Sequence, residues 1–373
     1  MSESARRSDS SAGQRRFPCA NCGAKLVFAP GVAALKCEYC GHENAIPKSD
    51  ERIEELDFLA HLSKLADSEE TEEAAIVKCD ACAAEIEPPA DATAFACPYC
   101  GADIVRTAAS RRLIKPKSLL PFKVTRELAW ASFFGWLRGL WFAPNRLKKY
   151  AQKDSTLTGM YVPFWTYDSK TTSYYTGQRG DDYWETETYT TTENGRSVTK
   201  TRQVRRTRWT SVSGTVWNPF NDILVMASRS LPRKYADRLE PWDLKNLVPY
   251  GDEYLSGFRA ERYQVDLAEG FGIAKEIMDE AIRESVRRDI GGDHQRIDSV
   301  QTQYNQITFK HILLPVWISA YRYNNKVYRF LVNARTGEVQ GERPYSWIKI
   351  TLFVLMIAAL VAGGVWLYMQ YGR

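Results

Sequence analysis

The end of the chain contains an apolar run that few environments can accommodate. From Ile350 to Met369 there are 20 residues without a charge. An α-helix rises about 1.5 Å per residue, so a helix over this run measures roughly 30 Å, the thickness of the hydrocarbon core of a bilayer. Trp347 and Trp366 stand near its two ends, as aromatic rings do at membrane interfaces. We therefore expect one transmembrane helix over residues 347–369.

A buried core helix is the alternative for this run. Only four residues follow Met369, so we expect no later domain that could bury it. Residues 1–16 are rich in Ser and Arg, lack the apolar segment of a secretory signal and are expected to be disordered. Transport of the preceding domains across a membrane is not expected without such a signal. The prediction is a tail-anchored, single-pass protein whose N-terminal part lies in the cytoplasm.

All eight cysteines fall into two sets of the same internal spacing. Each set has two C-x2-C pairs separated by 14 residues, and the second set is the first displaced by 60 residues. Each pair places two thiolates on one tight turn, and two turns supply the four ligands of a tetrahedral Zn²⁺. We predict two zinc ions in tandem four-cysteine ribbons, at residues 17–47 and 77–106. The predicted ligands are Cys19, Cys22, Cys37 and Cys40 in the first ribbon and Cys79, Cys82, Cys97 and Cys100 in the second.

Disulfides are the alternative for these cysteines, but they require an oxidising compartment, and no segment directs the chain to one. His42 lies two residues after Cys40. Because the cysteines already complete the ligand set, His42 is expected on the surface. Four thiolates also leave no coordination position for water, so both sites are expected to be structural and not catalytic.

Residues 48–76 are expected to form a helical and acidic linker between the ribbons. Apolar residues recur every third position up to Leu65, and Asp50 is placed to cap a helix over about 50–65. The acidic run that follows predicts a solvated spacer. The repeating positions are Ile53, Leu56, Leu59, Leu62 and Leu65, and the acidic residues are Glu69, Glu70, Glu72 and Glu73.

Residues 107–346 are expected to form a β-rich domain with helices. The chain has 20 Tyr and 11 Trp, which favour β-structure. Within this domain, residues 126–149 are crowded with aromatic and basic side chains. They predict a helix that either packs in the core or lies in the membrane interface. Because apolar residues cover most of its circumference, the core placement is favoured.

A β-hairpin is predicted around Asn194-Gly195, a dipeptide typical of two-residue turns. If these are the two loop residues, the two residue numbers of each cross-strand pair sum to 389. Glu187 then faces Arg202, and Trp184 faces Arg205. The basic run at 200–208 resembles a nucleic-acid-binding patch, but this register places each cation opposite an acid or an aromatic ring. Neutralisation within the hairpin is therefore favoured.

Two further patterns complete the domain. A helix is predicted from about Asp266 to Ile290, and Gly291-Gly292 ends it. Strands are predicted after it, with turns at Asn324-Asn325 and Thr336-Gly337. The expected buried face of the helix consists of Leu267, Phe271, Ala274, Met278, Ile282 and Val286.

Signatures of catalysis are absent from the sequence. It has no G-x4-G-K-[ST], H-E-x-x-H or G-x-S-x-G motif and only four histidines. Asp181, Asp182 and His294 could form a metal or acid–base site only if the fold brings them together. We therefore expect a protein that acts by binding and is not an enzyme.

Several segments besides the cysteines resemble a bacterial membrane family. Its members are named zinc-ribbon proteins, or primosomal protein N′ (replication factor Y) superfamily II helicase. The resemblance covers nearly the whole chain beyond residue 16, but the chain lacks the phosphate-binding loop that a helicase needs. The segments are LLPF at 119–122, LWFAPN at 140–145, YVPFW at 161–165, TGQRGDDYW at 176–184, DIGGDHQRI at 289–297 and NARTGEVQGERPYS at 333–346.

The resemblance implies a bacterial inner-membrane protein, and no catalytic residue is carried over from the family. Some similar proteins occur with partners of the phage-shock type, which bind stressed membranes. The leading hypothesis is a multidomain α+β adaptor that recruits protein partners to the membrane. The second is a membrane-tethered nucleic-acid-binding protein without helicase activity, which the net charge of +5 permits but does not require. The third is an enzyme of unknown reaction around Asp181, Asp182 and His294.

Overall fold

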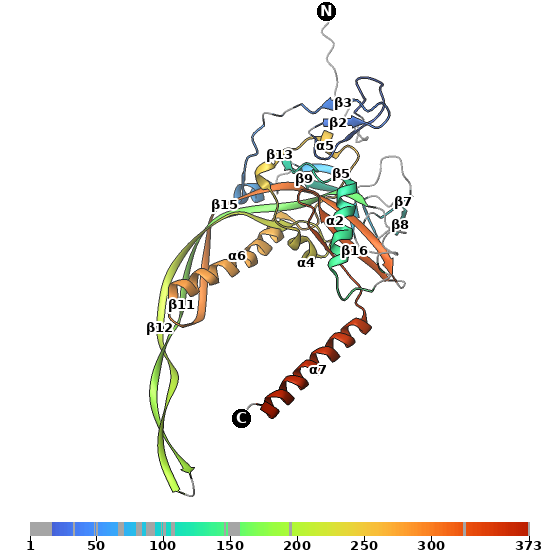
Figure 1. Cartoon of the computed structure of the whole chain (residues 1–373). Coiled ribbons are helices and arrows are strands. Elements are labelled where there is room, and N and C mark those ends of the chain that lie inside the picture. Colours follow the sequence, from blue (N-terminus) through green and yellow to red (C-terminus); the bar gives the residue numbers. More distant parts are fainter. Residues whose placement is uncertain are drawn as a thin grey trace, which may run out of the picture.

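The computed structural model shows an α+β fold with large antiparallel sheets, a cysteine cluster near the N-terminus and an apolar C-terminal helix (Figure 1). The prediction is confirmed at this level. The structure describes residues 17–371 except 33, 48, 50, 66–70, 80–83, 87–93, 98, 100–101, 106–108, 145–146, 148–156, 194–195 and 324–325.

Three long strands form the centre of the main sheet. Strand β11 (Thr158–Glu193) pairs antiparallel with both β12 (Arg196–Met226) and β15 (His294–Tyr323). Strands β16 (Lys326–Asn333) and β17 (Val339–Gly341) extend the sheet beyond β15. Four two-residue strands complete the nine that the described residues contribute. They are β4 (Leu56–Asp57), β10 (Ser118–Leu119), β13 (Val248–Pro249) and β14 (Arg259–Ala260).

The hairpin of β11 and β12 extends far beyond the rest of the sheet (Figure 1). Strand β15 pairs with β11 only as far as Gly180, opposite His294. Residues 181–193 and 196–208 continue as a two-stranded ribbon, here called the arm, which measures roughly 40 Å at about 3.3 Å per residue. The predicted register is confirmed, since Glu187 pairs with Arg202 and Trp184 with Arg205. The tip, residues 194–195, lies outside the described residues.

Helix α6 (Leu267–Ile290) covers the three-stranded base of the arm. Asp266 accepts a hydrogen bond from the backbone N–H of Glu269 at 2.8 Å and caps its first turn, and Gly291 ends it with a φ of +66°. A Cβ at Gly270 would lie 2.4 Å from the Tyr167 hydroxyl, so only glycine allows this close packing. The predicted helix is confirmed, and its buried face includes every expected residue: Leu267, Phe271, Ala274, Met278, Ile282 and Val286.

Helix α2 (Arg126–Gly139) packs in the core, as the favoured prediction stated. Thr125 caps it, and Ala129, Phe133 and Leu137 are buried. The Phe133 ring stacks on Phe330 of β16, with 3.6 Å between the ring centroids. The aromatic residues of the segment therefore attach this helix to one face of the sheet.

The predicted helix start at Asp50 is wrong. Residues 51–55 are not helical, Asp50 lies outside the described residues, and α1 spans only Phe58–Leu65. The cap is Asp57, whose Oδ1 accepts from the backbone N–H of Ala60 at 2.7 Å. The three-residue spacing of the apolar residues predicted too early a start. The residues just before the helix instead form β4, which pairs with Thr308 and Phe309 of β15.

The predicted solvated spacer is also wrong for the described part of the acidic run, which forms a strand. Strand β5 (Thr71–Lys78) pairs antiparallel with β9 (Ala109–Ile114), and Glu73 lies opposite Arg112. Composition alone predicts a solvated segment. The basic strand that pairs with the run follows more than 30 positions later, so the pairing cannot be inferred from the run itself. Glu69 and Glu70 lie outside the described residues.

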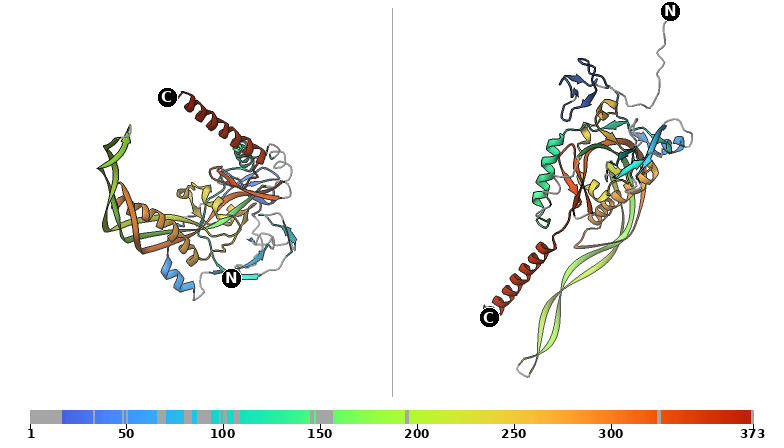
Figure 2. Two further views of the ribbon diagram at one scale, coloured as in Figure 1. Left: turned by 90° about the horizontal axis from the view of Figure 1, so that it is seen from below. Right: turned by 90° about the vertical axis from the view of Figure 1, so that its right-hand side faces the viewer.

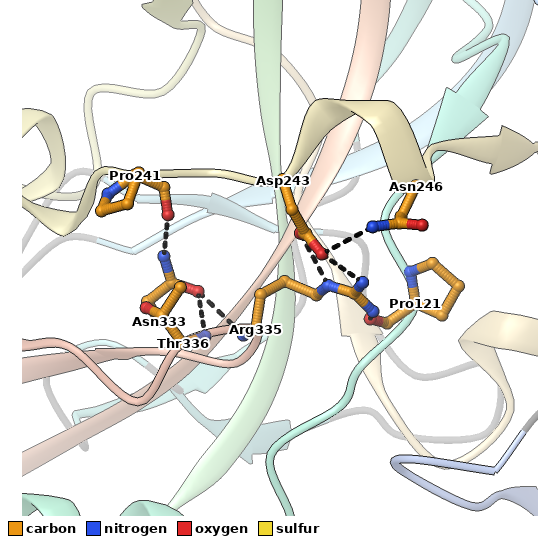
Figure 3. A network of polar contacts seen from close by, with 7 residues as sticks. All are labelled: Pro121, Pro241, Asp243, Asn246, Asn333, Arg335 and Thr336. Carbon is orange, nitrogen blue, oxygen red and sulfur yellow. Dashed lines mark hydrogen bonds and ion pairs between the residues drawn. The ribbon is translucent and has the colours of Figure 1, made fainter.

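A polar network fixes the turn between β16 and β17 (Figure 3). The Arg335 guanidinium donates to both carboxylate oxygens of Asp243, at 2.9 and 2.5 Å, and to the carbonyl of Pro121 at 3.0 Å. The buried Asn333 amide donates to the carbonyl of Leu239 at 2.7 Å. Gly337 has a φ of +83°, so the predicted turn at Thr336-Gly337 is confirmed. The predicted turn at Asn324-Asn325 lies outside the described residues.

Helix α7 (Trp347–Tyr371) ends the described chain and runs clear of the sheet (Figure 2). Its most apolar 18-residue window has a mean hydropathy of 2.5, and none of that window is buried. The helix is long and apolar enough to span a membrane, and the buried-core alternative does not hold in this structure.

Candidate metal centre

The first cysteine set lies on two similar turns of a small sheet. Its strands are β1 (Leu26–Phe28), β2 (Ala34–Cys37) and β3 (Glu43–Ala45). The backbone N–H of Cys19 donates to the carbonyl of Ala24 at 2.8 Å, and that of Cys37 donates to the carbonyl of His42 at 2.9 Å. Each first cysteine thus begins a turn that closes five residues later.

A glycine with positive φ completes each turn. Gly23 and Gly41 have φ values of +75° and +73°, and their N–H groups donate to the carbonyls of Cys19 and Cys37. A side chain would be strained in this backbone conformation. The glycine after each C-x2-C pair therefore allows the chain to turn sharply enough to present both sulfurs on one side.

The four sulfur atoms of this set lie within 4.8 Å of one another. Cys19 Sγ and Cys40 Sγ are 3.6 Å apart, as are Cys22 Sγ and Cys37 Sγ. A disulfide requires about 2.05 Å. A tetrahedral ion with ligands at about 2.3 Å would hold its sulfurs about 3.8 Å apart. The four cysteines are therefore placed to bind one metal ion.

The second turn favours the thiolate form of Cys40, whereas, despite a lowering hydrogen bond from the Ala24 backbone, the neighbouring sulfurs raise the pKa of Cys22. The backbone N–H of His42, helped by the Asn21 side chain, lowers the pKa of Cys40 to about 6. Cys19 and Cys37 are buried, whereas Cys22 and Cys40 lie at the exposed rim. The His42 residue is exposed, as predicted, and does not belong to the cluster.

The small sheet that carries the first cysteine set is attached to the main domain by backbone and ring contacts. The N–H of Phe28 donates to the carbonyl of Ser256 at 2.9 Å, and the Ser256 hydroxyl donates to the carbonyl of Leu26 at 2.7 Å. The Phe28 ring contacts Tyr254 and Phe258, with centroids 5.4 and 6.3 Å apart. The metal centre is thus fixed in place relative to the sheet.

The second cysteine set repeats the backbone pattern of the first. Cys79 N–H donates to the carbonyl of Ala84 at 2.8 Å, and Cys97 N–H donates to that of Ala102 at 2.7 Å, again five residues later. Cys79 and Cys97 are buried. Cys82 and Cys100 lie outside the described residues, so the sulfur geometry of this set is not described. Short strands surround these turns: β6 (Glu85–Ile86), β7 (Ala94–Ala96) and β8 (Asp103–Val105).

Two of the three residues considered for catalysis meet at the base of the arm. Asp182 Oδ2 lies 3.1 Å from His294 Nε2 and 2.8 Å from the Arg205 guanidinium, while Oδ1 accepts from the Thr207 hydroxyl at 2.7 Å. Asp181 instead pairs with Arg179. The hydrogen bond from Thr207, the contact with His294 and the positive charge of Arg205 lower the pKa of Asp182. The carboxylate is thus engaged on both oxygens and links β11, β12 and β15.

The basic run of the arm is paired within the arm. Arg202 contacts Glu187 at 2.7 Å, and Arg206 contacts Glu185 and Glu187. The guanidinium of Arg208 lies over the Tyr183 ring, 5.3 Å from its centroid. The prediction that this run is neutralised by its own hairpin is confirmed for these residues.

A partly buried ionic cluster in the three-stranded part of the sheet, where β4 pairs with β15, was missed at the sequence level. Lys310 Nζ lies 2.7 Å from Asp222 Oδ1 and 3.1 Å from Glu55 Oε1, and Asp168 Oδ1 accepts from the N–H of Asp222 at 2.5 Å. Burial raises the pKa of Asp168 to about 6, and the Glu55 carboxylate adds to this shift. Charges inside apolar strand sequences, such as Lys310 beside HILLP, are the signal that could have found it.

A second buried carboxyl, Glu261, lies between β14 and the segment after β12. The hydroxyls of Ser228, at 2.8 Å, and of Ser230 donate to its Oε1. Complete burial raises the pKa of Glu261 to about 7, although hydrogen bonds from Ser230, Tyr99 and Ser228 oppose the shift. Tyr99 belongs to the second cysteine segment, so this carboxyl lies where that segment meets the sheet.

Comparison with known proteins finds one relative that matches along nearly the whole chain. It is an uncharacterized protein, YdjG, of Bacillus subtilis strain 168. The two are 25% identical over 370 residues, which cover 93% of this chain and 98% of the relative. No family model matches the chain, and no solved structure matches it. The similarity is therefore not confined to the cysteine-rich segments.

Proposed function

We propose that this protein is a membrane-anchored adaptor that acts by binding and not by catalysis. Its anchor is α7, with the ribbons and the sheet on the cytoplasmic side of a bacterial inner membrane. Similarity to a bacterial protein along 93% of the chain supports the bacterial setting. The partners are soluble proteins, with phage-shock-type proteins as the first candidates.

The ion bound by the first cysteine set is zinc in this proposal, because four thiolates in tetrahedral spacing suit Zn²⁺. A second zinc is bound by Cys79, Cys82, Cys97 and Cys100. The repeated five-residue turns at Cys79 and Cys97 support this second site. Each ion would stabilise its turns and supply no reactive water, because its four positions are filled by sulfur.

The observation that carries the proposal is a set of four cysteines, placed to fill all four positions of one metal ion, in a domain that ends in a membrane-length helix. A closed centre of this kind stabilises a surface and offers no site for a reaction. The arm adds further surface, since 13 residue pairs project beyond the sheet and no other described strand pairs with either edge. Open edges and exposed side chains suit recognition of another protein.

Fractionation of cells tests the proposal. Cells that carry the intact protein, the Cys37→Ser variant or a deletion of residues 347–373 are separated into membrane and soluble fractions, with nuclease treatment throughout. The same soluble proteins should leave the membrane fraction in both variants.

Two results would contradict the adaptor. One is that no protein redistributes. The other is loss of the phenotype in His294→Ala with the fold and the membrane proteins unchanged, which would support an enzyme. Redistribution that depends on nuclease treatment would support the nucleic-acid-binding hypothesis instead.

A further inference from the structure

A cavity of about 670 Å³ lies where the end of α2 approaches the start of α7. Leu137 and Leu140 line it from the α2 side, and Leu352, Phe353 and Met356 line it from α7. Figure 1 shows α7 leaving the domain below the end of α2. One wall of the cavity is therefore the proposed membrane span itself, within its first three turns.

The position of α7 at this cavity is fixed by specific contacts. Lys349 Nζ donates to the carbonyls of Trp141 and Ala143, at 3.1 and 2.8 Å. The Phe142 and Phe353 rings meet edge to face, with centroids 5.4 Å apart. These contacts join α7 to the turn after α2, so the walls of the cavity are held together.

Cations line the cavity at the end that would face the membrane surface. Arg138 and Lys349 line the main cavity, and Arg343 lines a smaller hollow of about 210 Å³ that shares the Trp141 wall. Among the described residues, none that lines either hollow is acidic. Trp141 is 76% exposed, as expected for an aromatic ring at headgroup depth. Along α7 the lining thus changes from the cation Lys349 to apolar side chains.

We propose that this cavity binds one phospholipid with an anionic headgroup. The headgroup phosphate contacts Arg138 and Arg343, and an acyl chain lies along Leu352, Phe353 and Met356. This proposal rests on α7 being the membrane anchor. A lipid is the occupant because the lower wall belongs to an uncharged span, whose surroundings in a bilayer are acyl chains. Anionic lipid then stabilises the junction between the anchor and the domain.

Native mass spectrometry of the full-length protein in non-ionic detergent tests the site. The protein is titrated with phosphatidylglycerol or phosphatidylcholine. Phosphatidylglycerol should bind more tightly. The double variant Arg138→Gln and Arg343→Gln should weaken its binding by about 30-fold, or about fivefold for each cation, and leave phosphatidylcholine unchanged.

The matched control is the double variant Lys123→Gln and Arg126→Gln, which removes the same charge at the other end of α2. It should change the affinity for phosphatidylglycerol less than twofold. Equal losses of affinity for phosphatidylglycerol in both double variants would mean that only the net charge matters, and this would contradict the lipid site. A lack of preference for phosphatidylglycerol in the unaltered protein would also overturn it.

Flotation with vesicles of phosphatidylcholine and phosphatidylglycerol separates this proposal from the anchor on which it rests. Protein that fails to float with vesicles contradicts the anchor, and the lipid site with it. Protein that floats but binds both lipids equally contradicts the lipid site alone. Met356→Trp, which fills the apolar end of the cavity, should weaken the binding of both lipids. Unchanged binding would show that no acyl chain lies there.

Discussion

Lys310 balances partly buried charges in the three-stranded part of the sheet, where β4 pairs with β15. It contacts Asp222 and Glu55, and the structure leaves its side chain only 10% exposed. The side chains of Glu55 and Asp222 are 42% and 26% exposed, so removing Lys310 leaves carboxylates that water compensates only in part. The cluster therefore makes the joint between β4, β11, β12 and β15 sensitive to a single substitution.

Lys310→Met should lower the free energy of unfolding by about 1–2 kcal/mol, because the partly exposed Asp222 and Glu55 lose their counter-ion. Lys170→Met, at an exposed position of β11, is the control and should change it by no more than about 0.5 kcal/mol. Urea unfolding of the full chain in non-ionic detergent measures both. Equal stability of the two variants would show that the cluster contributes no more than a surface charge.

Glu261→Gln should change the free energy of unfolding by an amount that depends on pH. With a folded-state pKa of about 7 against an ordinary 4.5, Glu261 keeps a proton in the folded protein that the unfolded chain releases between these values. Its contribution to stability is therefore full below about pH 4.5 and is lost as the pH rises to 7. The variant should be more stable than the unaltered protein at pH 8, by up to about 3 kcal/mol, and similar to it at pH 4.5.

The measurement for Glu261 is urea unfolding at the two pH values, with the exposed Glu280→Gln as control. The control should show no such difference between pH 4.5 and pH 8. A pH-independent effect of Glu261→Gln would mean that the carboxyl is already ionised in the folded protein.

Cys22→Ser should reduce the zinc content from two ions to one per chain and unfold the first ribbon, because the ion supplies much of the folding free energy of such a small unit. Tyr39→Ser, in the Cys37–Cys40 turn of the same cysteine set and 86% exposed, should retain both ions. Elemental analysis of protein purified under reducing conditions measures the content. Protein that contains no zinc under these conditions would contradict the metal assignment.

At the scale of elements, the arm differs from the rest of the sheet because it is not supported by burial. No described residue between 185 and 204 is buried, and its pairs pack only across the ribbon. By contrast, the base of the arm is covered by α6, and Tyr175 there donates to Asp289 at 2.6 Å. The arm should therefore be dispensable for folding.

Replacing residues 185–204 by Asn-Gly keeps Trp184 opposite Arg205 and shortens the arm without a change of register. The melting temperature should remain within about 2 °C, because no buried contact is removed. Circular dichroism of the full chain in detergent measures it, and Gly270→Val, which clashes with Tyr167, is a destabilising comparison. A fall of more than about 8 °C would show that the arm stabilises the sheet.

Elements with local signals could be predicted from the sequence. The hairpin register followed from Asn194-Gly195, and the limits of α6 followed from Asp266 and Gly291. The cysteine cluster followed from spacing alone, because two tight turns determine where four sulfurs point. In each case the deciding residues lie close together in the chain.

Elements whose partners are distant could not be predicted. The start of α1 depends on β4 pairing with β15, about 250 residues away. The same separation joins Glu55 to Lys310, so neither periodicity nor composition could place the ionic cluster. Asp181 and Asp182 are neighbours in sequence, but a strand sends their side chains to opposite faces, and only Asp182 reaches His294.

At the scale of the whole molecule, the proposal requires two features in one chain. The ribbon supplies a rigid surface, and α7 fixes that surface to the membrane. Contacts of Phe28 with the segment around Ser256 connect the ribbon to the domain, and contacts of Lys349 connect the domain to the anchor. An adaptor needs this continuity, whereas a soluble binding protein would function without the anchor.

The most direct measurement of this claim compares membrane proteins in cells that express the intact chain with those in cells that express residues 1–346 and the anchor segment separately. Quantitative mass spectrometry of the membrane fraction is the readout. The proposal predicts that the soluble partners are present with the intact chain and are lost when the two parts are separate, although the zinc content of residues 1–346 is unchanged. Partners that stay at the membrane with the separated parts would contradict the adaptor.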